Sequence, residues 1–209
     1  MGMNGIINLP LFIITSVIII VAPGPDFLYV TTRGVSQGKK AGTVSALGIS
    51  VGLLIHTLLA AFGLSAIIQT SRIAYLAIKY IGAGYLIFLG LKTFMTRDQL
   101  FSRNEENGSK KNVFRQGILT NVFNPKAIVT FMAFMPQFVD IKISHPISQF
   151  LFLGVILSFI AVLWFGVVGY FAGLIGTFIR KYHFFQNGIK YLSGSILILL
   201  GLRLALKKE

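Results

Sequence analysis

Residues 143–179 read ISHPISQFLFLGVILSFIAVLWFGVVGYFAGLIGTFI and contain no Asp, Glu, Lys or Arg. About 20 apolar residues are enough to cross the hydrocarbon core of a bilayer as a helix. Residues 1–25 and 41–71 also lack these four charged residue types. Over the chain of 209 residues, 55% are hydrophobic and 12% are charged, whereas roughly 25% are charged in soluble domains. The sequence therefore predicts an all-α, polytopic membrane protein.

The apolar segments predict six transmembrane helices. They cover residues 6–22, 45–68, 73–94, 118–139, 147–179 and 189–206. The fifth segment could form a hairpin, but each half would be close to the minimum length of a span, so we expect one long tilted helix. The first segment has no basic residues before it, and two prolines follow it at once. We therefore expect it to be kept as a span and not removed as a signal peptide.

The formal net charge of +13 is arranged in short runs between the apolar segments. This layout is typical of cytoplasmic loops and not of a nucleic-acid-binding surface. The first loop carries Arg33, Lys39 and Lys40, and the third and fifth loops are also basic. We therefore expect these loops to face the cytoplasm and both termini to lie outside, with no nucleic-acid partner.

Enzyme chemistry finds no support in the sequence. It contains no cysteine, so disulfides and thiolate metal sites are excluded. It also lacks the common motifs of metallopeptidases, serine hydrolases and nucleotide-binding loops. We expect no catalytic residues, no cofactor and no metal site. His56, inside the second apolar segment, fits either a packed, hydrogen-bonded histidine or a proton relay.

The two halves of the chain resemble each other. Residues 80–94 (YIGAGYLIFLGLKTF) and 191–205 (YLSGSILILLGLRLA) match at six of fifteen positions with a constant offset of 111. Apolar helices can coincide by composition, but an aligned tyrosine, glycine and terminal cation favour a true repeat. We expect a first three-helix repeat at residues 1–95, a cytoplasmic linker at 96–112 and a second three-helix repeat at 113–209, together forming one membrane domain. Because three spans is an odd number, the second repeat must be inverted, as in many secondary transporters.

Two helix-breaking motifs occupy corresponding places in the halves. Residues 21–30 read VAPGPDFLYV, where Pro23, Gly24 and Pro25 cannot continue a helix, and residues 121–130 read NVFNPKAIVT, with Pro125 in the same role. Both motifs could be ordinary turns at the ends of spans. Apolar residues resume immediately after each one, which also fits broken helices within the membrane. Paired interruptions of this kind indicate a transporter's binding site.

Oppositely charged residues follow the two breaks. Intramembrane charges are costly, so Asp26 and Lys126 should be paired or functional. We predict that they share a cavity, where Asp26 binds an ammonium group or carries a coupling proton and Lys126 binds a carboxylate. Asn124, Tyr29 and Asn121 complete the predicted substrate- or proton-binding set. Asp26 also fits a helix N-cap, and Lys126 fits a lysine whose amine reaches the membrane surface.

These motifs carry a family resemblance. Residues 22–42 (APGPDFLYVTTRGVSQGKKAG) resemble the first signature of the LysE/RhtB superfamily of amino-acid exporters, and residues 121–139 (NVFNPKAIVTFMAFMPQFV) resemble its second. The pattern G-x-x-Y-L-I-x-L-G-x-K at residues 82–92 agrees. The resemblance implies a multi-pass protein of the bacterial inner membrane that exports amino acids or their derivatives, driven by the proton gradient. No motif selects one substrate among those of the family.

The partners implied are thus a small amino acid, protons and the lipid bilayer, while a homo-oligomer stays open. Two other functions also remain open. A cation or metal-ion exporter or channel on the same scaffold would need more than one buried acid, and Asp26 is almost alone within the apolar segments. A non-transporting membrane scaffold protein would not explain two paired helix breaks with opposite charges.

Overall fold

The structure, a computed structural model, describes residues 6–64, 66, 71–95, 109–140 and 146–181, with isolated positions between 191 and 206. Within this described part the chain is helical, and its strand pairing is limited to an isolated antiparallel bridge between Ile6 and Val139. Large apolar side chains such as Ile14, Phe62 and Leu163 are exposed on the outside. A helical protein with an apolar exterior is what a lipid environment favours, in agreement with the predicted class.

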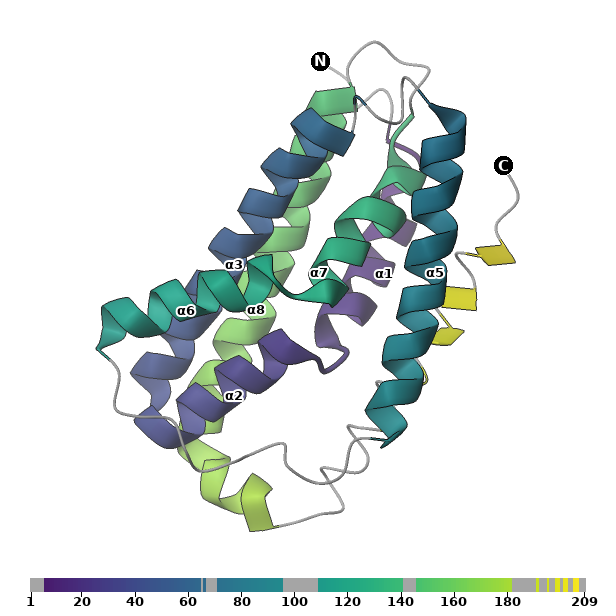
Figure 1. Ribbon diagram of the computed structural model, residues 1–209. Coiled ribbons are helices and arrows are strands. Elements are labelled where there is room, and N and C mark those ends of the chain that lie inside the picture. Colours follow the sequence, from purple (N-terminus) through teal and green to yellow (C-terminus); the bar gives the residue numbers. More distant parts are fainter. Residues whose placement is uncertain are drawn as a thin grey trace.

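Helices α1 (Leu9–Val21) and α2 (Pro25–Gln37) form a bent pair with an angle of 53°. In Figure 1, α1 runs from the N-terminal end of the molecule to its middle, where α2 turns away. The prediction that Pro25 lies in the break is wrong, because Pro25 is the first residue of α2. That position is favourable for proline, since its missing N–H would have no partner inside the helix. The break itself comprises residues 22–24.

Helix α3 (Lys39–Leu59) follows α2 directly and continues through a π-helical turn, η1 (Ala60–Leu64). The joint between α2 and α3 is Gly38, whose φ of 85° lies in the left-handed region that favours glycine. Helix α5 (Arg72–Met95) then occupies the third predicted segment with 24 residues.

The second bent pair begins with α6 (Lys110–Val122) and continues, after a bend of 48°, with α7 (Pro125–Val129). The chain goes on through a π-helical turn, η2 (Thr130–Phe134), and a 3₁₀ turn, η3 (Met135–Phe138). Pro125 is the first residue of α7, so this break too lies just before the proline, at residues 123–124. Helix α6 begins inside the predicted linker 96–112, because the Ser109 hydroxyl accepts a hydrogen bond from the Asn112 N–H (3.4 Å) and caps the helix.

Helix α8 (Pro146–Lys181) is one uninterrupted helix of 36 residues, which confirms the prediction of a single long helix over a hairpin. In the described part, α3 with η1 and residues 146–174 of α8 are each long and apolar enough to cross a membrane. The number rises to four if each bent pair is one span. The sixth predicted segment, 189–206, lies largely outside the described residues.

Glycines bring the helices close together. Gly48 of α3 faces Gly117 of α6, and Gly42 faces Gly169 of α8, so that an added Cβ at any of these positions would overlap backbone atoms. Small residues at such crossings let helices pack backbone to backbone in a membrane. The packing leaves the bend of α1–α2 next to the bend of α6–α7 in the middle of the molecule (Figure 1).

Candidate functional site

The first link between the two bends is made by Lys126. Its side chain is only 8% exposed, and its Nζ donates a hydrogen bond to the backbone carbonyl of Ala22, just past the end of α1. The last carbonyls of a helix have no partner within it and carry partial negative charge. The ammonium of the second half is therefore held by the broken end of the first half.

The second link runs in the opposite direction. Asp26 lies in the first turn of α2 and is buried, and its Oδ2 accepts a hydrogen bond from Nδ2 of Asn121 (2.8 Å) near the end of α6. The N-cap residue of α2 is Gly24, so the interpretation of Asp26 as an N-cap is wrong. Its carboxylate is bound to the other half of the chain instead of to its own helix.

Asn124 takes the capping role in the second break. Its Oδ1 accepts a hydrogen bond from the Lys126 backbone N–H (3.0 Å) and so begins α7. Three buried polar atoms at this crossing have no hydrogen-bond partner in the described part of the chain: Asp26 Oδ1, Asn121 Oδ1 and Asn124 Nδ2. The Asp26 carboxylate and the Asn124 amide nevertheless lie close enough to attract each other. The Asn121 oxygen is then the atom of the three without a nearby partner, at a cost of about 1–3 kcal/mol.

Asp26 and Lys126 line one small cavity of about 30 Å³. Apart from these two side chains and Thr130, its walls are apolar and come from α1, α3, α7 and α8: Ile19, Ile20, Leu53, Ala127, Leu157 and Phe165. The volume is enough for a water molecule but far below the roughly 300 Å³ at which ligand pockets begin. The cavity is therefore too small to hold an amino acid in this arrangement.

Tyr29 is not brought into this cavity. Its hydroxyl donates to the Val113 carbonyl (2.7 Å) at the start of α6. Beside it, Nη2 of Arg33 donates to Oε1 of Gln116 (2.5 Å), and the guanidinium lies 5.4 Å from the centre of the Tyr29 ring. The assignment of Arg33 to a loop is wrong, because it is a buried residue of α2. These contacts fasten α2 to α6.

His56 joins the site through Asn121. Its Nε2 lies 3.2 Å from the Asn121 backbone carbonyl oxygen, and its ring stacks on Phe131 at 5.4 Å between centroids. This contact agrees with the hydrogen-bonded interpretation of His56. The sequence did not identify the Ala22 carbonyl or the apolar walls of the cavity. An Asn-Pro pair is a recognisable N-cap followed by a first helical residue, so that signal could have revealed the capping role of Asn124.

Comparisons with known proteins identify the family of this chain. The family model of the LysE type translocator matches residues 17–208, which include both breaks, Asp26 and Lys126. The chain belongs to this family. Among curated relatives of this LysE type translocator, the uncharacterised membrane protein YrhP of Bacillus subtilis is 32% identical over 93% of this chain and 97% of its own length.

Several relatives carry a functional name. The leucine efflux proteins of Enterobacter sp. (strain 638) and Klebsiella pneumoniae are 28% and 29% identical, over 85% of this chain and 83% of their own lengths. No solved structure matches the chain. Membership of the LysE type translocator family and the apolar helices together place the protein in a membrane.

Proposed function

We propose that this translocator is a secondary transporter that exports amino acids with apolar side chains across the bacterial inner membrane. One observation carries the proposal. A carboxylate and an ammonium, Asp26 and Lys126, share a cavity whose other walls are apolar except for Thr130, where two bent helix pairs meet. A zwitterionic amino acid presents the complementary ammonium and carboxylate.

The two charged side chains supply matching partners. Asp26 accepts hydrogen bonds from the substrate ammonium, while Lys126 donates to its carboxylate. Asn121 and Asn124 do not line the cavity, and they act by holding the Asp26 carboxylate and by capping α7. To donate to the substrate carboxylate, Lys126 exchanges the Ala22 carbonyl for the substrate. Charge-assisted hydrogen bonds of this kind are about twice as strong as neutral ones.

The apolar walls determine the substrate's side chain. Leu53, Leu157 and Phe165 offer no partner to a second charge, and an unpaired charge in such surroundings would cost several kcal/mol. The substrate class is therefore that of leucine and similar aliphatic amino acids. The names of the two leucine efflux relatives support the same class.

We also infer six spans in two inverted three-helix repeats, with both termini outside. The bent pairs α1–α2 and α6–α7 stand at corresponding places in the two halves and have similar bends of 53° and 48°. Transporters built this way keep the site at the repeat interface and expose it alternately to each side. Admitting an amino acid to the small cavity therefore requires its walls to separate.

Proton coupling is assigned to Asp26, the acid among the residues lining the cavity. Its carboxylate binds the substrate ammonium on the cytoplasmic side and a proton on the outer side. Each cycle then exports one zwitterion and admits one proton. A metal cation is a poorer substrate, because Lys126 would repel it.

The test is efflux from proteoliposomes loaded with radiolabelled leucine, with and without a pH gradient. Leucine should leave the vesicles faster when the pH gradient drives protons inward in exchange. Lysine or glutamate loaded in the same way should leave no faster than from vesicles without the protein. Absence of leucine efflux would refute the proposed transport. Leucine efflux at the same rate with and without the pH gradient would refute proton coupling. Lysine efflux at the same rate as leucine efflux would refute the substrate class.

A further inference from the structure

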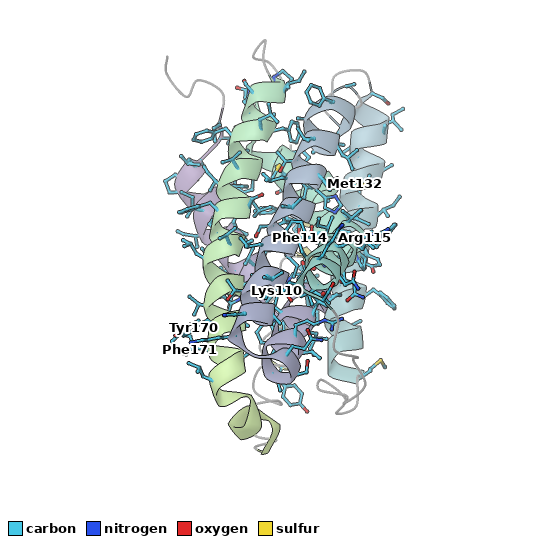
Figure 2. All side chains as sticks on the ribbon, turned by 90° about the vertical axis from the view of Figure 1, so that its left-hand side faces the viewer. Lys110, Phe114, Arg115, Met132, Tyr170 and Phe171 are labelled. Carbon is cyan, nitrogen blue, oxygen red and sulfur yellow. The ribbon has the colours of Figure 1, made fainter. Side chains whose placement is uncertain are left out.

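A second cavity, of about 330 Å³, opens on the surface where α3, α6 and α8 meet. Its lining shares no residue with the cavity at the bends. We call it the lysine cavity, after three of the residues that line it: Lys39, Lys40, Thr43, Val44, Lys110 and Tyr170. Figure 2 shows Lys110 and Tyr170 on the same face of the molecule, with Phe171 beside Tyr170.

The helix crossing explains how the lysines come together. Gly173 of α8 packs so tightly on the backbone of Lys39 that an added Cβ would lie 2.8 Å from its Cα. This contact sets the Lys39 side chain next to α8, where its Nζ lies 5.3 Å from the centre of the Tyr170 ring. A cation over an aromatic face is weakly attracted to it, which orients the amine at the cavity wall.

The lysine cavity is strongly positive. Helices α3 and α6 both begin in it, at Lys39 and Lys110, so their first N–H groups add partial positive charge to the three amines. None of the described residues that line it is acidic. An anion is the matching occupant.

Apolar side chains continue from the cavity along two helices. On α3, Leu47 and Leu54 follow Val44 at helical spacing, and on α8, Val167 and Leu174 flank Tyr170 at the same spacing. All four of these side chains are at least 40% exposed. In a membrane protein such a surface faces acyl chains, so the anion's headgroup site is joined to a lipid-facing surface.

We propose that the lysine cavity binds the headgroup of an anionic phospholipid, with the acyl chains lying along α3 and α8. The expected orientation puts the start of α3 and of α6 on the cytoplasmic side, where basic pockets between helices recognise anionic headgroups. The bound lipid contacts α3 of the first half and α6 and α8 of the second half. This inference is independent of the substrate proposed above.

The experiment titrates phosphatidylglycerol into the full-length protein in a neutral detergent and counts bound lipids by native mass spectrometry. The test variant is Lys39→Gln with Lys110→Gln. The control is Lys111→Gln with Arg115→Gln, which removes the same charge from exposed positions of α6 that do not line the cavity. The test pair should weaken the tightest binding roughly 30-fold, from about fivefold per lysine. The control pair should change it by less than about threefold, because its charges are screened.

A single substitution, Lys40→Gln, keeps the test decisive if the double variant does not fold, and it should weaken binding about fivefold. Phosphatidylethanolamine with the same acyl chains should bind more weakly than phosphatidylglycerol, and glycerol 3-phosphate should not displace the lipid. Equal binding of both lipids, or equal weakening by the control pair, would overturn the proposal. Displacement of the lipid by glycerol 3-phosphate at the same concentration as the lipid would also overturn the proposal, because the site would then bind a soluble anion.

Discussion

The two helix breaks use one backbone design but complete it differently. Each bends the chain by about 50°, starts the next helix with a proline and places a charged residue directly after it. At the first break the cap is Gly24, which has no side chain, and the Ala22 carbonyl stays open to Lys126. At the second, the Asn124 side chain caps its own helix. The difference teaches that the first break depends on the second for its polar partners, so neither half forms a finished site alone.

The largest effect should come from Asp26→Asn. The amide has the same shape and can still accept the Asn121 hydrogen bond, but it carries neither a negative charge nor a proton to exchange. Leucine efflux should fall to the level of vesicles without the protein, while the amount of protein in the membrane is unchanged. The matched control, Asp140→Asn, alters an acid outside both cavities and should leave efflux intact. Normal efflux by Asp26→Asn would show that the first break does not carry the transport chemistry.

Lys126→Ala should impair the same pair of charged residues, Asp26 and Lys126, at the second break. Losing a charged hydrogen bond of about 1.5–3 kcal/mol should slow efflux roughly 10- to 150-fold. It also leaves Asp26 buried without the neighbouring positive charge, so the melting temperature should fall. Adding Asp26→Asn to Lys126→Ala should restore part of the lost stability and make efflux no worse than the worse single variant. Losses of melting temperature that simply add in the double variant would mean that the two breaks work independently.

Gly52→Ala should disturb the link between the breaks without touching either charge. An added Cβ would lie 2.6 Å from Oδ1 and 2.7 Å from Cβ of Asn121, and so would push that residue away from Asp26. Overpacking of this kind costs about 1–3 kcal/mol, which should lower the melting temperature by roughly 2–12 °C. Gly63→Ala is the control, since nothing lies within 4 Å of a Cβ there. Equal melting temperatures for the two variants would contradict the close contact at Asn121.

The smallest effect is expected from Asn124→Ala, which removes the cap that distinguishes the second break. Loss of an N-cap costs about 1 kcal/mol, or roughly 2–4 °C in melting temperature for a chain of this length. Ser109→Ala removes the longer, exposed cap bond of α6 and should cost less. A thermal melt of both variants in the same detergent tests this order, and a reversed order would refute the capping role of Asn124.

The sequence predicted the parts of the fold that depend on local chemistry. Long apolar runs indicated α3 and α8, and the prolines indicated both breaks to within a residue or two. The shared cavity of Asp26 and Lys126 was also predicted, because the two breaks stand at corresponding places in the halves.

Long-range contacts were beyond the reach of these patterns. The partner of Lys126 is a backbone carbonyl, which no residue type reveals, and it depends on where the two bends cross. Tyr29 follows Asp26 by three positions and was expected beside it, but the tilt of α2 carries its hydroxyl to Val113. The position of α2 is set by helix contacts such as that of its Gly34 with Gly169 of α8, which only the folded chain brings together.

The small bridge between Ile6 and Val139 has a consequence for biosynthesis. The Ile7 N–H donates to the Phe138 carbonyl (2.9 Å), and Phe12 of α1 stacks on Phe134 and meets Phe138 edge to face. The ribosome makes α1 before these partners, since residues 134–138 follow the end of α1 by more than 110 positions. Helix α1 must therefore wait without these final neighbours, and the closing of this bridge marks a late step in assembly.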